Sequence, residues 1–453
     1  MTIWLNVTTT NRWNGHAVGI SRVELELASA LKERIKFFEI RDREFKEVAY
    51  QQIISEKDVE KKKYVPRNSR LFQFFDAQKG TSTSWLILKM GGIALSLIMR
   101  VLPDNFQESI LSNLYRVIRK FDKQLKKRIS PIRVDDKSAK NSGINRIPSS
   151  ELTSVDFTIN HPFHHGDTVV SCGLDWDYSL VEYVNLIKSE IDFKFVTWIY
   201  DVIPVYYPEV ISSVSHCARL FKHFALVGGV ADEVVYISEN TRRDFEKFCH
   251  QIGLKTPPGR VITLASDFEI STPKEGETLE LSRFGIRGQY ILSVGTLEPR
   301  KNYWTLVNAR SSMVSDEGLQ LVIIGRVGWS TGDLLTYVNH QKGKNVIILN
   351  NITDDELNQL YQNASALMSA SIAEGFNLPA LEAQSAGLPT FLSDIPTHRE
   401  LFPQAEFIAT FDTPAWSRAM QEVAQGRYPK SVKPFIGKRW NEYADEVIAL
   451  LKM

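Results

Sequence analysis

The stretch Ala373-Glu-Gly-Phe-Asn-Leu-Pro-Ala-Leu-Glu-Ala-Gln-Ser-Ala-Gly-Leu-Pro389 decides the fold of the second half of the chain. Pro379 suits the first position of a helix, because the N–H that proline lacks has no intrahelical partner there. Gly387 suits the residue that ends such a helix before the next strand. The stretch therefore predicts a loop, a helix that begins at Pro379, and a buried strand from Pro389 onward.

Two carboxylates and a glycine surround the start of this predicted helix. Glu374 lies in the loop before it, Gly375 lets a ligand approach the backbone closely, and Glu382 lies in the first turn. Helix N-termini attract anions, and carboxylates accept hydrogen bonds from sugar and ribose hydroxyls. The pattern is typical of a site for a phosphorylated, polyhydroxylated ligand. A capped helix with two solvated acids explains the same residues, so both interpretations stand at this point.

Short apolar runs alternate with amphipathic helical patterns on both sides of this stretch. Near-continuous apolar runs are typical of strands that are buried on both faces of a parallel sheet. The expected strands are residues 2–7, 168–171, 193–199, 233–237, 290–294, 319–324, 345–349 and 389–393. Helical spacing of apolar residues predicts helices at 20–32 and 438–451. The fold class is α/β, with two sheets that a polar, turn-rich segment at 266–281 separates.

A second loop that could bind a ligand follows the expected strand at 290–294. Gly295 begins this loop at a strand's carboxyl end, where open α/β sheets bind their ligands. Arg300 and Lys301 in the same loop suit a diphosphate, although a solvated pair of cations is the ordinary alternative. Residues 325–329 (Gly-Arg-Val-Gly-Trp) form a third strand-end loop. No GxxxxGK[ST] motif occurs, so the sequence does not support P-loop phosphoryl transfer.

The composition of the chain restricts its class. With 453 residues, 43% of them hydrophobic and 24% charged, it has the profile of a globular protein of two or three domains. The net charge of +1 provides no overall field that favours nucleic acid. Three widely spaced cysteines indicate a reducing compartment rather than a disulfide scaffold. Residues 1–8 lack the basic region and apolar run of a secretory signal, so we expect a cytoplasmic protein.

One segment departs from the α/β alternation. Residues 85–99 are largely apolar but contain Lys89, and they are shorter than the roughly 20 residues of a spanning helix. In the next segment, apolar residues recur every three or four positions, as on one face of a helix. Residues 116–133 of this segment contain eight basic residues and one acidic residue, Asp122. Such a helix suits the interface of an anionic membrane, with its apolar side toward the acyl chains. A helix packed on the domain with a solvated basic face is the alternative.

Two polar clusters in the first half have less specific patterns. His161, His164 and His165 precede an expected strand together with Asp167, but no second set of ligands at zinc spacing accompanies them. A loop role is therefore expected in preference to a metal site. Residues 175–177 (Asp-Trp-Asp) follow a strand end, where they suit either an acceptor sugar or a buried tryptophan.

Together these motifs resemble glycosyltransferase family 4 over roughly residues 285–405. The matching segments are 295–302, 325–329, 354–361 (Asp-Asp-Glu-Leu-Asn-Gln-Leu-Tyr) and 374–382, the last being the family's E-x7-E signature. In the first half, the likeness is carried by Tyr200-Asp-Val-Ile-Pro204, Ile237-Ser-Glu-Asn-Thr241 and Asn14-Gly-His-Ala-Val-Gly19. The resemblance implies the GT-B fold, in which two Rossmann-like domains face each other across a cleft.

By this resemblance, residues 1–270 form an acceptor-side domain with a helical basic insertion at about 64–155. Residues 281–437 form the domain that binds the nucleotide sugar. The C-terminal helix, within 438–453, is expected to cross back onto the first domain, as it commonly does in enzymes of this fold.

The resemblance also implies roles for individual residues. The carboxylate of Glu374 would accept the hydroxyls of the donor hexose, and Glu382 would hold the ribose. The remaining donor-site residues would be Phe376 and Asn377, through their amides, and Gly15, Gly19, Gly295 and Gly375, where the backbone comes close to the phosphates. Arg300 and Lys301 would neutralise the diphosphate as it leaves.

The sequence departs from the family pattern at two positions. Thr296 stands where many members have arginine, which leaves more of the phosphate contact to Arg300. Tyr200 stands where many have histidine, so Asp201 becomes the polar candidate beside the transferred sugar or the acceptor. No pair of carboxylates can be assigned as nucleophile and acid in the manner of a glycosidase.

The implied function is retaining transfer of a hexose from a nucleotide diphosphate sugar, with no metal and no other cofactor. The form of residues 295–302 resembles mannosyltransferase-like members, so the first donor expected is GDP-mannose. The expected acceptor is a lipid-linked glycan, such as an O-antigen precursor of lipopolysaccharide, and the expected location is the inner face of the cytoplasmic membrane, in contact with anionic lipid and not with nucleic acid. A nucleotide-sugar epimerase of GT-B fold and a non-catalytic nucleotide- or glycan-binding protein are the alternatives. A dehydrogenase is disfavoured, because no GxGxxG follows the first strand.

Overall fold

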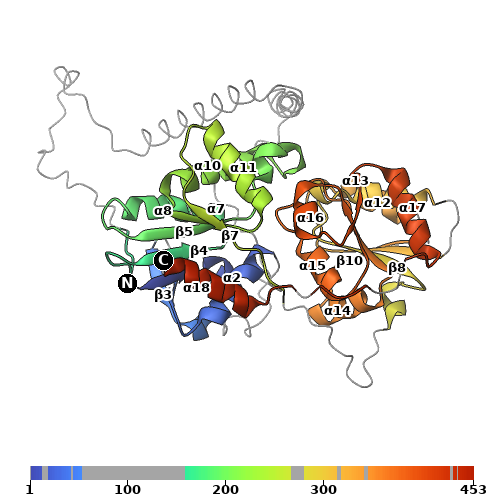
Figure 1. The fold of residues 1–453 in the computed structure, drawn as a ribbon, viewed down its shortest axis with the longest axis horizontal. Helices are drawn as coiled ribbons and strands as arrows, with labels where there is room; N and C mark the ends of the chain where they lie inside the picture. Colours follow the sequence, from blue (N-terminus) through green and yellow to red (C-terminus); the bar gives the residue numbers. More distant parts are fainter. Residues whose placement is uncertain are drawn as a thin grey trace, which may run out of the picture.

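The computed structural model describes residues 2–12, 19–41, 44–53, 159–266, 280–313, 318–340, 345–428, 432–435 and 437–452. They form two domains, each built around a sheet of its own (Figure 1). Gly15, the basic insertion expected at about 64–155 and most of the segment 266–281 lie outside the described residues. Among the residues that are described, no helix has both the length and the apolar character needed to cross a membrane.

The first sheet has seven strands in the order β3-β2-β1-β4-β5-β6-β7. Neighbouring strands are parallel except β2 and β3, which pair antiparallel at one edge. The strands are β1 (Ile3–Asn6), β2 (Lys36–Arg41), β3 (Glu44–Val48), β4 (Thr168–Ser171), β5 (Lys194–Ile199), β6 (Glu233–Tyr236) and β7 (Gly259–Val261). Every residue of β1 and β4 is buried, as expected of strands that helices cover on both faces.

Helices on both faces of this sheet bury its apolar side chains. They are α1 (Thr8–Arg12), α2 (Ile20–Leu31), α7 (Asp175–Tyr178), α8 (Leu180–Ile187), α9 (Ile203–Tyr206), α10 (Val214–Val230), α11 (Glu239–Gln251) and the short 3-10 helix η1 (Pro208–Val210). The C-terminal helix α18 (Trp440–Leu451) packs against α2 in the first domain, more than 400 residues away along the chain (Figure 1). Trp198 of β5 donates its indole N–H to the hydroxyl of Tyr443 in α18 over 2.8 Å.

The second sheet has six parallel strands in the order β10-β9-β8-β11-β12-β13. The strands are β8 (Tyr290–Val294), β9 (Gln320–Ile324), β10 (Val346–Leu349), β11 (Ala366–Ser369), β12 (Thr390–Ser393) and β13 (Glu406–Ile408). The helices around it are α12 (Tyr303–Ser311), α13 (Gly332–His340), α14 (Asp354–Asn363), α15 (Leu378–Ser385), α16 (Pro396–Leu401) and α17 (Thr413–Ala424), with 3-10 turns η2 (Leu281–Phe284) and η3 (Pro299–Lys301). The α/β class with two Rossmann-like sheets is therefore confirmed.

All eight strands predicted from the sequence are present within a residue or two at each end, and the described part of the chain contains five further strands that the sequence did not predict. Of the missed strands, β11 contains no β-branched residue, which removes the signal that identified its neighbours. Strand β3 lies at a sheet edge and has one buried residue among its five, so it lacks an apolar run. Tertiary pairing, rather than local sequence, determines these strands.

The carboxyl ends of the two sheets face each other, because loops that follow strands of one sheet contact loops that follow strands of the other. Ser238, after β6, donates its hydroxyl to the carbonyl of Gly375, after β11, over 3.0 Å. Helices α11 and α16 also meet here, between the two lobes of Figure 1. The carboxylate of Glu400 in α16 accepts the backbone amides of Glu239 and Asn240, at 2.6 and 2.8 Å, and thereby caps the N-terminus of α11 across the domain boundary.

Candidate active site

The loop between β11 and α15 carries the first carboxylate of the E-x7-E signature. Helix α15 begins at Leu378, so Pro379 is its second residue rather than its first, and Glu382 lies in the second turn rather than the first. Asn377 caps the helix in the left-handed region, at φ 91°. Glu374 thus precedes α15 by four residues and lies at its N-terminal end, as expected, but Glu382 is one turn further from that end.

Glu374 is a buried carboxylate held between two cations. Its Oε1 lies 2.6 Å from Nζ of Lys301, and its Oε2 is bonded to the guanidinium of Arg300. Burial by itself would raise the pKa of Glu374, but the charges of Arg300 and Lys301 outweigh burial and hold the pKa well below its usual range. Glu374 is therefore ionised at any physiological pH.

The loop after β8 supplies both cations through the 3-10 turn η3. Arg300 also bonds Glu298, with 2.6 Å between Nη2 and Oε1, and donates to the carbonyl of Ala373 over 3.0 Å. Burial lowers the pKa of Lys301, and the charge of Glu374 opposes that effect. The structure brings Glu374, Arg300 and Lys301 into one cluster, in which Glu374 and Lys301 are buried and Arg300 is half-buried. A diphosphate that used these cations would have to share them with the two carboxylates.

Gly295 leaves the space that Lys301 occupies. It has a φ of +147°, and a Cβ at this position would lie 3.0 Å from Cε of Lys301. A Cβ at Gly325, after β9, would collide with the carbonyl oxygen of Gly295. Both glycines therefore allow the strand-end loops to pack closely beneath the cation cluster.

A buried hydrogen-bond chain that sequence reasoning missed fixes the loop at Asn377. The amide Nδ2 of Asn377 contacts Nε2 of His398 at 2.9 Å, and Nδ1 of His398 contacts the carbonyl of Ser393 at 2.8 Å. Because a carbonyl can only accept, Nδ1 carries the proton and Nε2 accepts from Asn377. Burial lowers the pKa of His398 to about 4, so the imidazole is neutral. No signal in the sequence distinguished His398 from an ordinary helical residue.

The neighbouring Phe376 has an apolar role in addition to its backbone amide. Its side chain is buried and meets the ring of Phe402 edge to face, with centroids 6.1 Å apart. Phe376 therefore anchors the loop to the domain core.

The first domain forms the opposite wall of this region through Tyr200 and Asp201. A Cβ at Gly375 would collide with the carbonyl oxygen of Tyr200, which shows how closely the two domains approach here. Thr241 donates to the same carbonyl over 3.1 Å. Asp201 is half-buried and accepts the amide of Ile203 at 3.0 Å; burial raises its pKa, and the nearby charge of Arg300 opposes the rise. The structure thus places Asp201 within the electrostatic reach of the cation cluster.

Glu382 lies deeper along α15 and has partners from both domains. The hydroxyl of Tyr361 in α14 lies 3.1 Å from its Oε2, and Nη1 of Arg22 in α2 lies 3.3 Å from its Oε1. Burial raises the pKa of Glu382, and the charge of Arg22 opposes the rise. Sequence reasoning missed Arg22, because nothing in a linear pattern relates residues 22 and 382. Gly19, three residues before Arg22, is exposed at φ 54° immediately before α2.

The polar residues proposed for an acceptor at 175–177 have structural partners instead. Asp175 is buried and accepts from the hydroxyl of Ser171 at 2.5 Å and from Thr197 at 3.2 Å. Trp176 packs its ring edge to face against His223, with centroids 5.4 Å apart. Asp175 is therefore disfavoured as an acceptor ligand, whereas for the half-buried Trp176 an acceptor contact stays a prediction.

Buried carboxyl groups in the first domain include Glu24 as well as Asp175. Oε1 of Glu24 accepts the amide of Thr10 at 2.6 Å. A Cβ at Gly173 would collide with Oε2 of Glu24, so the absence of a side chain there makes room for the acid. Burial raises the pKa of Glu24 to about 8 and that of Asp175 to about 7. Both groups bind a proton more tightly than exposed acids do.

In the segment before β4, Asp167 has the structural contacts, whereas His164 and His165 are exposed. Asp167 accepts the amide of Thr2 at 2.7 Å and the indole N–H of Trp4 at 3.1 Å, which anchors the start of β1. His164 is exposed, with its ring Nδ1 3.8 Å from Asp167. In the part of the chain that the structure describes, no group of three or more His, Cys, Asp or Glu residues is arranged to hold a metal ion.

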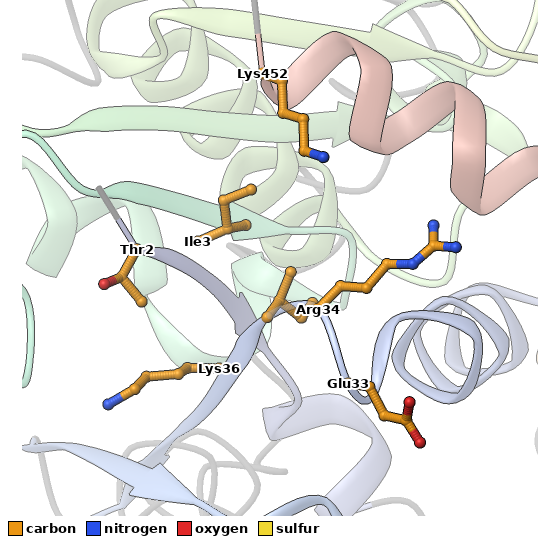
Figure 2. Close-up of a pocket in the computed structure, with 7 residues that line it drawn as sticks. Thr2, Ile3, Glu33, Arg34, Lys36 and Lys452 are labelled. Atoms are coloured by element: carbon orange, nitrogen blue, oxygen red, sulfur yellow. The ribbon is translucent and has the colours of Figure 1, made fainter.

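A cavity of about 450 Å³ lies elsewhere in the first domain (Figure 2). The residues that line it are Thr2, Ile3, Glu33, Arg34, Ile35, Lys36 and Lys452. Thr2 and Ile3 mark the amino end of β1, whereas ligands of parallel sheets bind at the carboxyl ends. The cavity is therefore separate from the cluster around Glu374.

The sequence of the second domain is similar to those of known glycosyltransferases. Residues 283–434 match the family model of glycosyl transferases group 1. Over 310 residues the chain is 28% identical to the serotype-specific mannosyltransferase WbdA of Escherichia coli, an alignment that covers 59% of this chain and 37% of WbdA. It is 29% identical over 137 residues to the O-antigen chain mannosyltransferase RfbU of Salmonella typhimurium. This alignment covers 30% of this chain and 38% of RfbU. The chain spans less than half the length of these relatives.

The fold extends beyond the matched segment. The crystal structure of Anabaena Alr3699/HepE in complex with UDP and glucose superimposes with a TM-score of 0.55, covering 99% of this chain and 95% of that protein at 11% sequence identity. At such identity the likeness concerns the fold alone, which is GT-B. Residues 283–434 thus match glycosyl transferases group 1 within a GT-B fold, in agreement with the resemblance to glycosyltransferase family 4.

Proposed function

We propose that the protein is a retaining hexosyltransferase that moves mannose from GDP-mannose to a lipid-linked glycan in the synthesis of a bacterial surface polysaccharide. The observation that carries the proposal is the buried carboxylate of Glu374, which is ionised between Arg300 and Lys301 at the N-terminal end of α15. An ionised carboxylate accepts hydrogen bonds from sugar hydroxyls, and the two cations suit a diphosphate. The mannose assignment is supported by WbdA and RfbU, which are described as mannosyltransferases.

The chemistry requires stabilisation of a leaving diphosphate. As the bond between the anomeric carbon and the diphosphate oxygen breaks, negative charge grows on that oxygen, and in this proposal Arg300 and Lys301 offset that charge. The acceptor oxygen bonds to the anomeric carbon on the face that the diphosphate leaves. The acceptor's proton passes to the departing phosphate, so no protein carboxylate is needed as a nucleophile.

The test combines a donor panel with an acceptor. The full chain is incubated with GDP-mannose, UDP-glucose and UDP-N-acetylglucosamine, each with and without a lipid-linked glycan extract, and release of nucleoside diphosphate is measured. Acceptor-dependent release of GDP supports the proposal. Turnover without an acceptor indicates an epimerase, and binding without turnover indicates a non-catalytic protein. The anomeric configuration of the product, measured by NMR, tests retention separately.

The proposed transfer uses no bound metal, because Arg300 and Lys301 supply the positive charge that a metal would otherwise bring to the diphosphate. The experiment is to dialyse the protein against EDTA and to repeat the assay in EDTA. Full activity is the expected result. Loss of activity that Mg²⁺ or Mn²⁺ restores would contradict this part of the proposal.

We further propose that the protein works at the cytoplasmic face of the membrane, where lipid-linked glycans present their headgroups. Support comes from the sequence pattern of residues 116–133, which lie outside the described residues. Replacing Lys123, Lys126, Lys127 and Arg128 with glutamate should reduce flotation of the protein with vesicles that contain anionic phosphatidylglycerol. Unchanged flotation would exclude an interfacial role for this segment.

A further inference from the structure

An ion pair between the two domains ends on the second carboxylate of the signature. Arg22 belongs to α2 of the first domain and Glu382 to α15 of the second, and their Nη1 and Oε1 atoms lie 3.3 Å apart. The pair joins residues that are 360 positions apart in the sequence. It is therefore a product of the way the two domains face each other.

The fold fixes the position of Arg22. Its chain neighbour Val23 is fully buried, as is Leu27 one turn further along, and α18 packs against the same helix. The side chain of Arg22 retains 32% exposure, and its Nε lies 3.9 Å from Oε1 of Glu26. The guanidinium therefore extends from a well-packed helix toward the other domain while part of it remains in solvent.

The charges around Glu382 make Arg22 important for its ionisation. Burial raises the pKa of Glu382, and the carboxylate of Asp354 adds to the rise. Tyr361 lowers the pKa by donating a hydrogen bond, and Arg22 lowers it by its positive charge. Without the positive charge of Arg22, the pKa of Glu382 would rise further above its usual value.

The number of acceptor positions on Glu382 matches a ribose. An ionised carboxylate has about four lone-pair positions. Within the part of the chain that the structure describes, Tyr361 on Oε2 and Arg22 on Oε1 use two of them. Two positions remain, which equals the number of hydroxyls on the 2′ and 3′ carbons of a ribose.

We propose that Arg22 is a positioning residue of the nucleotide site, supplied by the opposite domain: it orients Glu382 and keeps it charged, so that the ribose diol of a nucleoside diphosphate is recognised only when the two domains face each other as they do here. The inference rests on the proposed function, because it takes Glu382 as the ribose-binding carboxylate. It makes nucleotide affinity dependent on a residue outside the glycosyl transferases group 1 segment.

The test is calorimetric titration of the full chain with GDP and, in parallel, with UDP between pH 6 and pH 9. Arg22→Ala and Arg22→Gln should raise the Kd at pH 7 about tenfold, with affinity recovering as the pH rises and Glu382 ionises. Arg22→Lys should restore much of the pH profile, because it keeps the charge. Glu26→Gln is the matched control, since Glu26 is the other acid beside Arg22 on the same helix and should leave the Kd unchanged.

A second measurement connects Arg22 to the ribose itself. In the native chain, 2′,3′-dideoxy-GDP should bind more weakly than GDP, and in Arg22→Ala the difference between the two ligands should shrink. A steady-state assay should show a raised KM for the donor with a smaller change in kcat. A purely structural role for Arg22 would change the melting temperature but not the dideoxy difference.

The outcomes separate this inference from the proposed function. If Glu382→Gln weakens GDP and UDP binding but Arg22→Ala has native affinity at every pH, the ribose site stands and the role of Arg22 is overturned. If neither variant changes the affinity for either nucleotide, Glu382 is not the ribose ligand and the placement of the donor fails with it. Arg22→Gln, which keeps the length and polarity of the side chain, provides the measurement if Arg22→Ala does not fold.

Discussion

The ammonium of Lys301 lies 2.6 Å from the carboxylate of Glu374, and both side chains are buried. They come from the loops that follow β8 and β11, which are adjacent strands of the second sheet. Burying either charge alone would be costly, so each depends on the other and on Arg300. The site is therefore charged and oriented before any ligand arrives, which is the arrangement that electrostatic catalysis requires.

Substitution of Glu374 tests this arrangement directly. Glu374→Gln keeps the shape of the side chain but removes the charge that faces Arg300 and Lys301. We expect hexose transfer to fall by about 10²–10³-fold, the range found when one preorganised polar contact is removed from an active site. Affinity for nucleoside diphosphate should be kept or improved, because both cations lose a competing anion. Steady-state assays and calorimetry measure the two quantities.

Two comparisons give this prediction its specificity. Glu298→Gln removes the charge of a carboxylate that bonds Arg300 but leaves the carboxylate of Glu374 in place, so a smaller loss of transfer is expected. Glu382→Ala should weaken nucleotide binding, whereas Glu374→Gln should not. Native transfer activity in Glu374→Gln would show that the N-terminal end of α15 is not the site of reaction.

Gly375 tests the close approach of the two domains. In Gly375→Ala the new Cβ would collide with the backbone carbonyl of Tyr200, which cannot move away as a flexible side chain would. We expect kcat/KM to fall by about 10²-fold, because small displacements of reacting groups have effects of that size. Gly332→Ala is the matched control, since a Cβ there meets nothing within 4 Å. Equal activity of the two variants would show that this contact is unimportant.

Glu400 tests the cap that one domain places on a helix of the other. Glu400→Gln removes the negative charge at the N-terminus of α11, where its oxygens accept the amides of Glu239 and Asn240. A loss of about 0.5–2 kcal/mol in the free energy of unfolding is expected, typical of a helix cap. Urea unfolding measures it, with Glu246→Gln on the exposed side of the same helix as the control. Equal stability of the two variants would show that the charge of Glu400 does not stabilise the N-terminus of α11.

The raised pKa of Glu24 predicts how the free energy of unfolding depends on pH. Burial raises its pKa in the folded chain to about 8 from an ordinary value of 4.5, so the folded state holds this proton more tightly than the unfolded state. The stabilisation is complete below about pH 4.5 and is lost as the pH rises toward 8, at no more than about 1.4 kcal/mol per unit. Asp175, raised to about 7, acts in the same direction.

Glu24→Gln cannot ionise and should therefore lose less stability between pH 5 and pH 8.5 than the native chain. Some pH dependence should remain, because Asp175 still titrates. Urea unfolding at the two pH values measures the difference, and Glu26→Gln, at a half-buried position of the same helix, is the control. An unchanged slope in Glu24→Gln would show that Glu24 is ionised in the folded state.

Much of the fold was predictable, because most of its strands have a local pattern of apolar residues that identifies them. The run Tyr290–Val294 has the near-continuous apolar character of a doubly covered strand, and its bounds in the structure are those predicted. Strand β11 was missed because it contains no β-branched residue, and β13 was missed because it has three residues and lies at the edge of the sheet, where it pairs with β12. The start of α15 was misplaced by one residue, since proline fits the first turn at more than one position.

The sequence by itself determined the α/β class, the two sheets and the chemical types at the strand ends, because hydrophobic periodicity and turn residues act over a few positions. It placed Glu374, Arg300 and Lys301 on loops that meet at one sheet edge. Only the tertiary structure decided that Lys301 and Arg300 share Glu374, that His398 is a neutral support for Asn377, and that Arg22 reaches Glu382. These contacts join residues far apart in the chain, and their ionisation depends on burial and on charges from another loop or another domain, which no local pattern contains.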